Sequence, residues 1–330
     1  MLSGISIAPV DRAAARAMHE HICEFAAPIG SLGRIEELAE WLAAIHGGFP
    51  PSPYERRAIV IGAGDHGDTD ATARRVRAFA AGSSAIGAFA RAARAQAFVA
   101  NFGLARPAPP HERIFDVAVA AGTRGFADGP AMPHEHVDAA LRAGVEVFER
   151  VRARCDPQIL ALGEMGENAA SAAALVCALT GAPPEDVVAR GAGSDEARVR
   201  ATTALVTLAV ARAGEGDWRA IAAQAGGYEL VGLAGVLLAA ARARLPILLD
   251  GLAVGAAALL ARAIEPAAAE YCVASHRSRE HGHAVVLRAL GLVPLLDLDL
   301  RLGEGTGAAL GFALCEAAAR MVCEMKPAEN

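Results

Sequence analysis

A glutamate flanked by glycines is the most informative feature of this sequence for chemistry. Glu304 lies in the run Arg301-Leu-Gly-Glu-Gly-Thr-Gly, after the apolar segment 292–298 and before a helical pattern that begins at 306. Glycines let a ligand come close to the backbone, and a partly apolar setting raises the pKa of a carboxyl toward that of a general base. From the residue types alone, a solvated glutamate at the start of a helix is the simpler alternative, since negative charge is favourable there.

Two other glycine-rich segments are suited to bind a phosphate. Residues 163–168 (GEMGEN) follow an apolar run and open an Ala-rich helical segment. A helix N-terminus has unpaired N–H groups and a positive dipole end, and both favour an anion. An N-cap role for Asn168 is the structural alternative. Residues 189–200 repeat the pattern and add the candidate phosphate partners Arg190, Arg198 and Arg200.

A third glycine-rich segment, residues 62–67 (GAGDHG), matches the G-x-G-x-x-G pattern of dinucleotide-binding folds. Three features argue against that function. The segment lies about sixty residues into the chain, polar residues follow it where a helix should pack closely on a strand, and the next apolar run ends in Asn101 rather than an acid. We interpret it as a tight strand-to-helix turn and keep a nicotinamide-cofactor oxidoreductase as an alternative.

The histidine-rich segment 275–283 (SHRSREHGH) lacks the spacing of a metal site. Its histidines show no H-E-x-x-H pattern, no cysteine or carboxylate stands at ligand spacing, and no G-x-S-x-G elbow surrounds its serines. The six cysteines of the chain form no C-x-x-C pair and are expected to be reduced thiols. We therefore expect no metal.

Composition and charge narrow the class of protein. Of 330 residues, 54% are hydrophobic and 21% charged, which is enough for a large core. The net charge is −6 without basic runs, so no nucleic-acid partner is expected. The N-terminus lacks a signal-peptide pattern, and charges and a proline interrupt the apolar segment 230–264 before it reaches the length of a membrane span. We expect a cytoplasmic protein with no membrane partner.

Apolar runs of strand length alternate with Ala-rich stretches of helical length. The expected strands are 58–63, 97–102, 114–120, 158–163, 245–250, 271–275 and 292–298. The expected helices are 31–46, 83–95, 135–153, 168–180, 197–213, 232–244, 252–263, 279–290 and 306–325. This alternation predicts an α/β fold with a mostly parallel sheet covered by helices on both faces. Because ligands bind at the carboxyl ends of parallel strands, the polar motifs that follow the strands should meet at one edge.

Several segments form a pattern that is specific in combination. They are PIGSLGRIEELAEWLAAI (28–45), Asp65-His66-Gly67 with GSSAIGAFAR (82–91), GEMG (163–166), and a C-terminal third with GGYELVGLAG (226–235), LLDG (248–251), SHRSREHGH (275–283) and LGLVPLLDLDLRLGEGTGAAL (290–310). In order and spacing they resemble the nicotinate-nucleotide:dimethylbenzimidazole phosphoribosyltransferase family over most of the chain, as a divergent member.

The resemblance implies a fold and a reaction. The family has a Rossmann-like parallel sheet with a small helical domain, which here corresponds to 1–50 with part of 306–330, beside the phosphoribosyltransferase domain 51–305. Its members transfer ribose 5-phosphate from nicotinate mononucleotide to a benzimidazole base, for the lower ligand of cobalamin. They are homodimers, and no metal or organic cofactor is implied.

The resemblance also assigns residues to roles. The glutamate of the R-L-G-E-G motif, which takes the proton of the benzimidazole, corresponds to Glu304. Met165 and Leu302 correspond to positions beside the base. The residues that correspond to contacts with the nucleotide or its phosphate are Glu164, Gly166, Asn168, Gly191, Gly193, Arg200 and Ser275.

Two segments depart from the family pattern. After Asp65-His66-Gly67, a short stretch that walls the base pocket is missing, and Arg74 stands where the family has glutamine. In the phosphate loop, GEMGENAAS replaces G-E-M-G-I-G-N-T-T, and Glu167 brings negative charge near a phosphate. The second hypothesis is therefore an altered-substrate or non-catalytic paralog that binds a nucleotide or an aromatic base.

Overall fold

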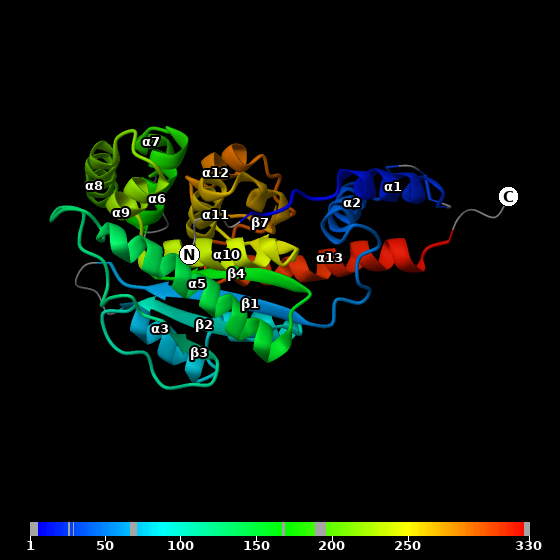
Figure 1. The fold of residues 1–330 in the computed structure, drawn as a ribbon, viewed down its shortest axis with the longest axis horizontal. Coiled ribbons are helices and arrows are strands. Elements are labelled where there is room, and N and C mark those ends of the chain that lie inside the picture. Colours follow the sequence, from blue (N-terminus) through cyan, green and yellow to red (C-terminus); the bar gives the residue numbers. More distant parts are fainter. Residues whose placement is uncertain are drawn as a thin grey trace.

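The structure is a computed structural model that describes residues 6–25, 27–28, 30–66, 71–166, 169–188 and 196–326. Its centre is a sheet of six parallel strands in the order β3-β2-β1-β4-β5-β6. Helices lie on both faces of this sheet (Figure 1). The strands are β1 Arg57–Gly64, β2 Gln96–Gly103, β3 Ile114–Asp116, β4 Ile159–Met165, β5 Ile247–Leu249 and β6 Cys272–Ala274.

Helices connect most of the strands, and a separate pair of short strands lies outside the main sheet. The short strands are β7 His276–Arg277 and β8 Leu296–Asp297, and a 3-10 helix spans Pro266–Tyr271. The α-helices are α1 Arg12–Cys23, α2 Arg34–His46, α3 Ala71–Ala80, α4 Ala85–Ala92, α5 His134–Cys155, α6 Ala169–Thr180, α7 Pro184–Val187, α8 Glu196–Ala213, α9 Trp218–Ala225, α10 Tyr228–Arg242, α11 Leu252–Ile264, α12 His283–Leu290 and α13 Thr306–Glu324.

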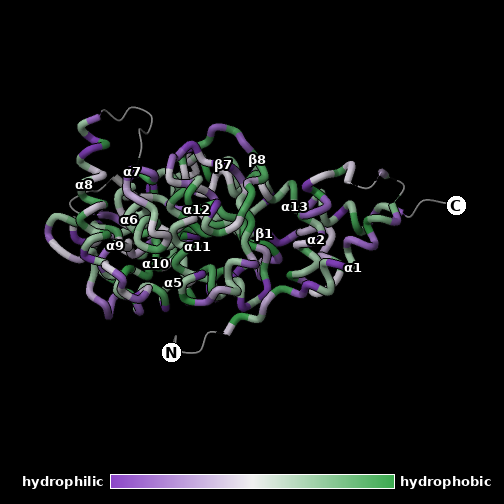
Figure 2. The backbone as a smooth tube through the Cα atoms, turned by 90° about the horizontal axis from the view of Figure 1, so that it is seen from above, coloured by the Kyte–Doolittle hydropathy of each residue, from purple (hydrophilic) through white to green (hydrophobic). Residues whose placement is uncertain are grey.

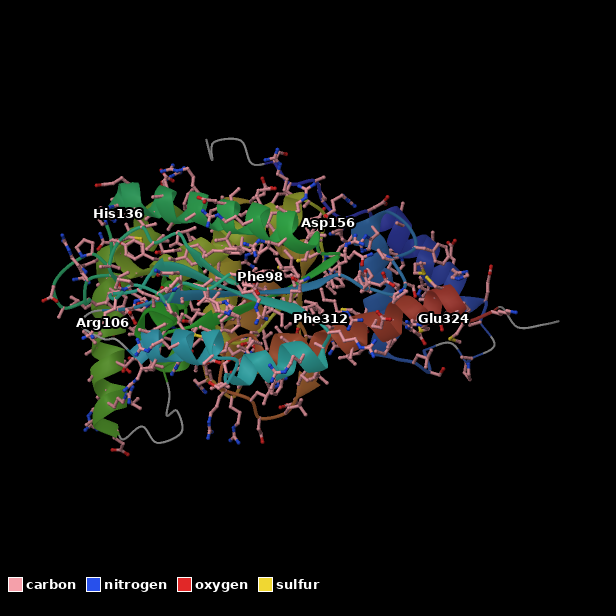
Figure 3. All side chains as sticks on the ribbon, turned by 90° about the horizontal axis from the view of Figure 1, so that it is seen from below. Phe98, Arg106, His136, Asp156, Phe312 and Glu324 are labelled. Atoms are coloured by element: carbon pink, nitrogen blue, oxygen red, sulfur yellow. The ribbon has the colours of Figure 1, made fainter. Side chains whose placement is uncertain are left out.

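The central strands are apolar on both faces because helices cover both. Along β1, Val60 belongs to one core cluster and its neighbours Ile59 and Ile61 to another, since successive side chains of a strand point to opposite faces. The first cluster includes residues of α5, α6, α10 and α11, and the second includes residues of α2, α4 and α13. Phe98 of β2 lies in the first cluster and Phe312 of α13 in the second (Figure 3).

The predicted α/β fold with a mostly parallel sheet is confirmed, with two differences in the strands. The expected strand 114–120 ends at Asp116. The expected strand 292–298 is wrong as a member of the main sheet, because its strand residues, Leu296–Asp297, pair with β7 instead. Leu298 is 51% exposed, and a segment this exposed cannot be a central parallel strand that is buried on both faces.

The most apolar stretches of the chain are core elements. The segment 230–264 forms most of α10, then β5 and α11, as the predicted helix, strand and helix. Figure 2 shows hydrophobic residues gathered around α10 and α11 inside the molecule. In the part of the chain that the structure describes, α13 is long and apolar enough to cross a membrane by length and composition. It packs on α2, α4 and β4 and is mostly buried, so its place in the core accounts for its apolarity.

The helices α1 and α2 lie at one end of the molecule, beside the C-terminal part of α13 (Figure 1). Ile22 of α1 and Leu38 of α2 share a core cluster with Val322 of α13. The division into a small helical subdomain, from 1–50 and part of 306–330, and a phosphoribosyltransferase domain, 51–305, stays a prediction.

Helices α5 and α10 cross at glycines. A Cβ on Gly144 would overlap the carbonyl oxygen of Gly232 and lie 2.8 Å from the amide nitrogen of Val236. Both atoms belong to the backbone and cannot rotate away. Gly144→Ala is therefore expected to lower the free energy of unfolding by about 2 kcal/mol, the cost of overpacking, as measured by urea denaturation.

The matched control for this crossing is Gly48→Ala, at a position where a Cβ would meet nothing within 4 Å. It is expected to change the free energy of unfolding by less than about 1 kcal/mol. A Gly144→Ala variant as stable as the wild type would contradict the close crossing.

Candidate active site

A cavity of about 310 Å³ lies at the carboxyl ends of β4 and β5. The strand order reverses between β1 and β4, and the crevice beside such a point is where open α/β sheets bind ligands. The wall carries both signs of charge, which suits a ligand with an anionic phosphate and a group that must lose a proton. Among its lining residues are Arg75, Glu164, Arg198, Glu280, Arg301 and Leu302.

Asp250, directly after β5, organises the turn that precedes α13. Its carboxylate accepts hydrogen bonds from the backbone N–H groups of Gly305 (2.9 Å), Gly307 (2.9 Å) and Ala308 (3.1 Å). His276 Nε2 lies 3.1 Å from the same carboxylate, and Asp250 is 1% exposed. The first N–H groups of a helix have no partner within the helix, and a carboxylate satisfies them. The start of α13 is thereby tied to the end of β5.

Three successive residues of this turn have positive φ. The angles are 79° at Gly303, 62° at Glu304 and 83° at Gly305. The turn lies directly against β4: the Glu304 N–H donates to the carbonyl oxygen of Glu164 (2.9 Å), and a Cβ on Gly163 would lie 2.5 Å from the carbonyl carbon of Glu304. Positive φ is unfavourable for a glutamate, so contacts with the surrounding structure must hold it.

The carboxyl group of Glu304 is buried and has a raised pKa. Glu304 is 6% exposed. Burial raises the pKa of this carboxyl above its usual range, the Arg75 guanidinium opposes the shift, and Asp250 adds to it. A carboxylate with a raised pKa accepts a proton more readily near neutral pH. Arg301, Leu302 and Gly303, directly before it in the chain, line the cavity, whereas Glu304 itself is not among the lining residues.

Glu164 and Gly166 form another part of the wall, at the end of β4. A Cβ on Gly166 would lie 2.6 Å from Glu164 Oε1 and 2.9 Å from the carbonyl oxygen of Gly64, so a larger residue would not fit. Arg75 Nη1 donates to the carbonyl oxygen of Gly166 (3.2 Å). Arg75 therefore contacts the turn at the end of β4 from the wall of the cavity, and the charge of its guanidinium lowers the pKa of Glu304.

The predicted contacts of the nucleotide and base divide into three groups. Glu164, Gly166 and Leu302 line the cavity. Met165 and Ser275 are fully buried and are not among the lining residues. The predicted phosphate-binding residues that lie outside the described residues are Asn168, Arg190, Gly191 and Gly193.

Two predicted cations do not line the cavity, and a near neighbour of each does. Arg74 is exposed and absent from the wall, whereas Arg75 lines it. Arg200 is exposed and pairs with Glu196 (3.6 Å), whereas Arg198, which is also a candidate phosphate partner from the sequence, lines the cavity. Successive residues of a helix are about 100° apart around its axis, so an alignment that is off by one or two positions selects the wrong face.

Sequence reasoning missed three residues of this site: Asp250, Arg75 and Glu280. The Glu280 carboxylate accepts from the N–H of Leu252 (3.3 Å) and from Ser278 Oγ (3.2 Å), and burial raises its pKa. A signal for Asp250 was available, because an acid at the polar end of an apolar strand faces the ligand edge of a parallel sheet. Glu280 lies in the motif SHRSREHGH (275–283), which marks the segment but not this residue. No comparable pattern marks Arg75.

The glycines of the G-x-G segment, at the end of β1, allow close packing on α10. A Cβ on Gly62 would lie 2.8 Å from Leu233 Cγ, and one on Gly64 would overlap the carboxylate of Glu229. Helix α10 thus approaches the strand closely where these glycines leave room. This contact accounts for the two glycines without a bound dinucleotide. The predicted strand-to-helix turn includes Gly67, which lies outside the described residues.

Two of the three histidines in the segment 275–283, His276 and His283, form hydrogen bonds within the protein. His276 contacts Asp250, and His283 Nδ1 accepts the N–H of Ser278 (2.9 Å). Burial, followed by the charge of His276, lowers the pKa of His283 to about 4. Within the ranges that the structure describes, no three His, Cys, Asp or Glu side chains form a group that could hold a metal ion. The expectation of no metal or organic cofactor stays a prediction.

Comparisons with known proteins agree with one another. A family model described as DBI_PRT, phosphoribosyltransferase, matches residues 7–330. Relatives named nicotinate-nucleotide–dimethylbenzimidazole phosphoribosyltransferase include those of Chloroflexus aggregans, 40% identical over 97% of this chain and 93% of the relative, and Thermus thermophilus, 43% identical over 89% and 91%. The crystal structure of nicotinate-nucleotide-dimethylbenzimidazole phosphoribosyltransferase from Thermus thermophilus matches with a TM-score of 0.91 and 40% identity, over 96% of this chain and 97% of that chain.

The cap at the start of α13 can be tested with Asp250→Asn. Both oxygens of Asp250 accept hydrogen bonds, one from Gly305 and the other from Gly307 and Ala308. An amide replaces one acceptor by a donor and leaves a buried N–H without a partner. The free energy of unfolding, from urea denaturation, is expected to fall by about 2 kcal/mol.

The control for this cap is Asp217→Asn, at the N-cap of α9. There one carboxylate oxygen accepts from Ala220 (2.9 Å). Asparagine caps a helix as well as aspartate, so a change below about 0.5 kcal/mol is expected. Equal effects of the two substitutions would show that the second oxygen of Asp250 contributes nothing.

Proposed function

The chain belongs to the nicotinate-nucleotide–dimethylbenzimidazole phosphoribosyltransferase family, and from that premise we propose that it transfers ribose 5-phosphate from nicotinate mononucleotide to a benzimidazole-type base. The product is α-ribazole phosphate, for the lower ligand of cobalamin. The observation that supports this most directly is the buried Glu304, whose pKa is raised and whose backbone is locked in a turn at the edge of the cavity.

The proposed reaction needs a base more than it needs an acid. Nicotinate is bonded to C1′ of the ribose as a cationic pyridinium, so it leaves with little help. The acceptor attacks C1′ through one ring nitrogen and loses the proton of its second nitrogen. Glu304 accepts this proton, which raises the electron density on the attacking nitrogen. The carbon–nitrogen bond to nicotinate breaks as the bond to the acceptor forms.

The donor phosphate is proposed to lie at the N-terminal end of α6. Gly166 and Ala169 line the cavity there, and backbone N–H groups at the start of a helix favour an anion. Arg75 and Arg198 on the same wall supply positive charge, and Glu164 is proposed to face the ribose. Other phosphate and nucleotide contacts that the family resemblance assigns stay predictions: Asn168, Gly191, Gly193, Arg200 and Ser275.

The acceptor base is proposed to lie beside Leu302, which lines the cavity and is 51% exposed. Val293 and Leu298, on the segment before the turn that contains Glu304, are 63% and 51% exposed. Apolar side chains exposed beside a site favour contact with another protein surface. They support the further proposal that the protein acts as a homodimer. The expected cytoplasmic location stays a prediction.

The activity is tested by mixing the purified protein with nicotinate mononucleotide and 5,6-dimethylbenzimidazole and separating the products by chromatography. Glu304→Gln keeps the size of the side chain but cannot accept a proton. It is expected to lower kcat at least about 100-fold, with the affinity for nicotinate mononucleotide unchanged in calorimetry.

The control for this test is Glu149→Gln, an exposed carboxylate on α5, which is expected to leave kcat unchanged. A Glu304→Gln variant with wild-type kcat would remove the base from the mechanism. Failure of the wild type to form product with any acceptor in a panel of benzimidazoles would refute the proposed reaction.

The dependence of kcat on pH at low pH should follow the ionisation of the Glu304 carboxyl group. Only its ionised form accepts a proton, so kcat is expected to increase as the pH rises through the raised pKa and to level off above it. The Arg75 guanidinium lowers this pKa. Arg75→Met is therefore expected to move the acid limb to higher pH, as measured by kcat across the pH range.

Arg74→Met is the matched control, because this neighbouring arginine is exposed and does not line the cavity. Its acid limb is expected to coincide with that of the wild type. An unmoved limb in Arg75→Met, or the same shift in both variants, would contradict the placement of Arg75 beside Glu304.

A further inference from the structure

A buried polar cluster around His66 lies next to the cavity, and the proposed mechanism does not use it. His66 follows β1 and belongs to the Asp65-His66-Gly67 motif. It forms a parallel bridge with Thr123. Its imidazole contacts side chains from three other parts of the chain, and the side chain itself is 12% exposed. A polar group in such a place needs partners, and their arrangement indicates its use.

The imidazole connects α10 with α6. Nε2 lies 2.9 Å from Oε1 of Glu229, a residue in the first turn of α10 that is 0% exposed. Nδ1 lies 2.9 Å from Oγ of Ser171 and 3.0 Å from Oγ1 of Thr123. A Cβ on Gly227 would lie 2.5 Å from His66 Cε1, so the backbone before α10 closes over the ring.

The carboxylates around the ring favour its charged form. Burial lowers the pKa of His66, but the charge and hydrogen bond of Glu229 and the charge of Asp65 together raise it above its usual value. In the imidazolium both ring nitrogens donate. Nε2–H then donates to Glu229, and Nδ1–H points to the hydroxyl groups of Ser171 and Thr123. A buried carboxylate such as Glu229 requires a partner of this kind.

Ser171 is the third residue of α6 and is 4% exposed. The same first turn contains Ala169, which lines the cavity together with Gly166. The end of β1 also lies close to the segment before α6: a Cβ on Gly166 would lie 2.9 Å from the carbonyl oxygen of Gly64. The segment that contains His66 therefore contacts the first turn of α6 through Ser171.

We propose that His66 is a positioning residue for the ribosyl donor: through Ser171 it fixes the first turn of α6, and thereby the N–H groups that bind the donor phosphate. This inference rests on the proposed function and assigns a role to a motif that the reaction itself leaves unused. A positioning role of this kind predicts that substitution lowers the affinity for the donor and changes the rate of the chemical step little. The reason is that Glu304, and Asp250 which caps α13, lie on elements other than α6.

The test compares Ser171→Ala and His66→Gln with the wild type. Ser171→Ala removes one hydroxyl from α6, and His66→Gln retains a donor toward Glu229 while it loses the bond to Ser171. Both are expected to raise KM for nicotinate mononucleotide about tenfold, the effect of one lost buried hydrogen bond, with kcat changed less than about threefold. Calorimetry with nicotinate mononucleotide should show the same loss of affinity.

Thr180→Ala is the matched control, because it removes a hydroxyl from the far end of α6, where Thr180 Oγ1 donates to Val176 (2.7 Å). It is expected to leave KM and kcat unchanged. A Ser171→Ala variant with wild-type KM, or one that loses kcat while KM stays constant, would overturn the inference. Ser171→Ala deletes a single atom, so it stays informative if His66→Gln does not fold.

The same data separate this inference from the proposed function. If the wild type turns over and binds the donor but Ser171→Ala binds it equally well, the positioning role alone is wrong. If the wild type neither binds nicotinate mononucleotide nor turns over, the proposed function fails and the inference fails with it.

Discussion

The carboxylate of Asp250 joins the two parts of the molecule on which the site depends. It stands at the end of β5 and accepts N–H groups from the beginning of α13, a helix of 19 residues. An α-helix cannot satisfy its first N–H groups internally, and a buried helix end needs a partner for them. Because a single carboxylate does this from the edge of the sheet, the turn directly before α13 has a defined position relative to the strands.

That turn is held on its other side by backbone contact with β4. Gly163 approaches the backbone of Glu304 and Gly305 more closely than any residue with a Cβ could. One hydrogen bond then links Glu304 to Glu164, so the two acidic residues stand next to each other on neighbouring elements. The positive φ of Glu304 is maintained by these contacts, as expected for strain at a functional site that the surrounding structure over-determines.

The charge of the cavity differs from that of the whole chain. The protein carries a net charge of −6, yet the wall of the cavity includes Arg75, Arg198 and Arg301. Binding of an anionic donor depends on such local groups and on helix N–H groups rather than on the total charge. Arg75 has a double effect, since it contacts the turn at the end of β4 and also lowers the pKa that burial raises in Glu304.

Much of the fold and the centre of the site could be predicted from the sequence, because they depend on local patterns. Apolar runs between helical segments indicated a parallel sheet, and the glycines around Glu304 marked the turn before the last helix. The same patterns placed the segment 292–298 in the sheet, where exposure of Leu298 rules it out. A short apolar run does not indicate which strand the segment will pair with.

What the tertiary structure decided are the contacts between residues far apart in the chain. Sequence could not tell whether Arg74 or Arg75 faces the cavity, because one helical position turns a side chain by about 100° and the orientation of α3 is set by packing. Nor could it pair Asp250 with the start of α13, or His66 with Ser171 on α6. These pairs are 57 and 105 residues apart, and only the folded chain brings such partners within hydrogen-bonding distance.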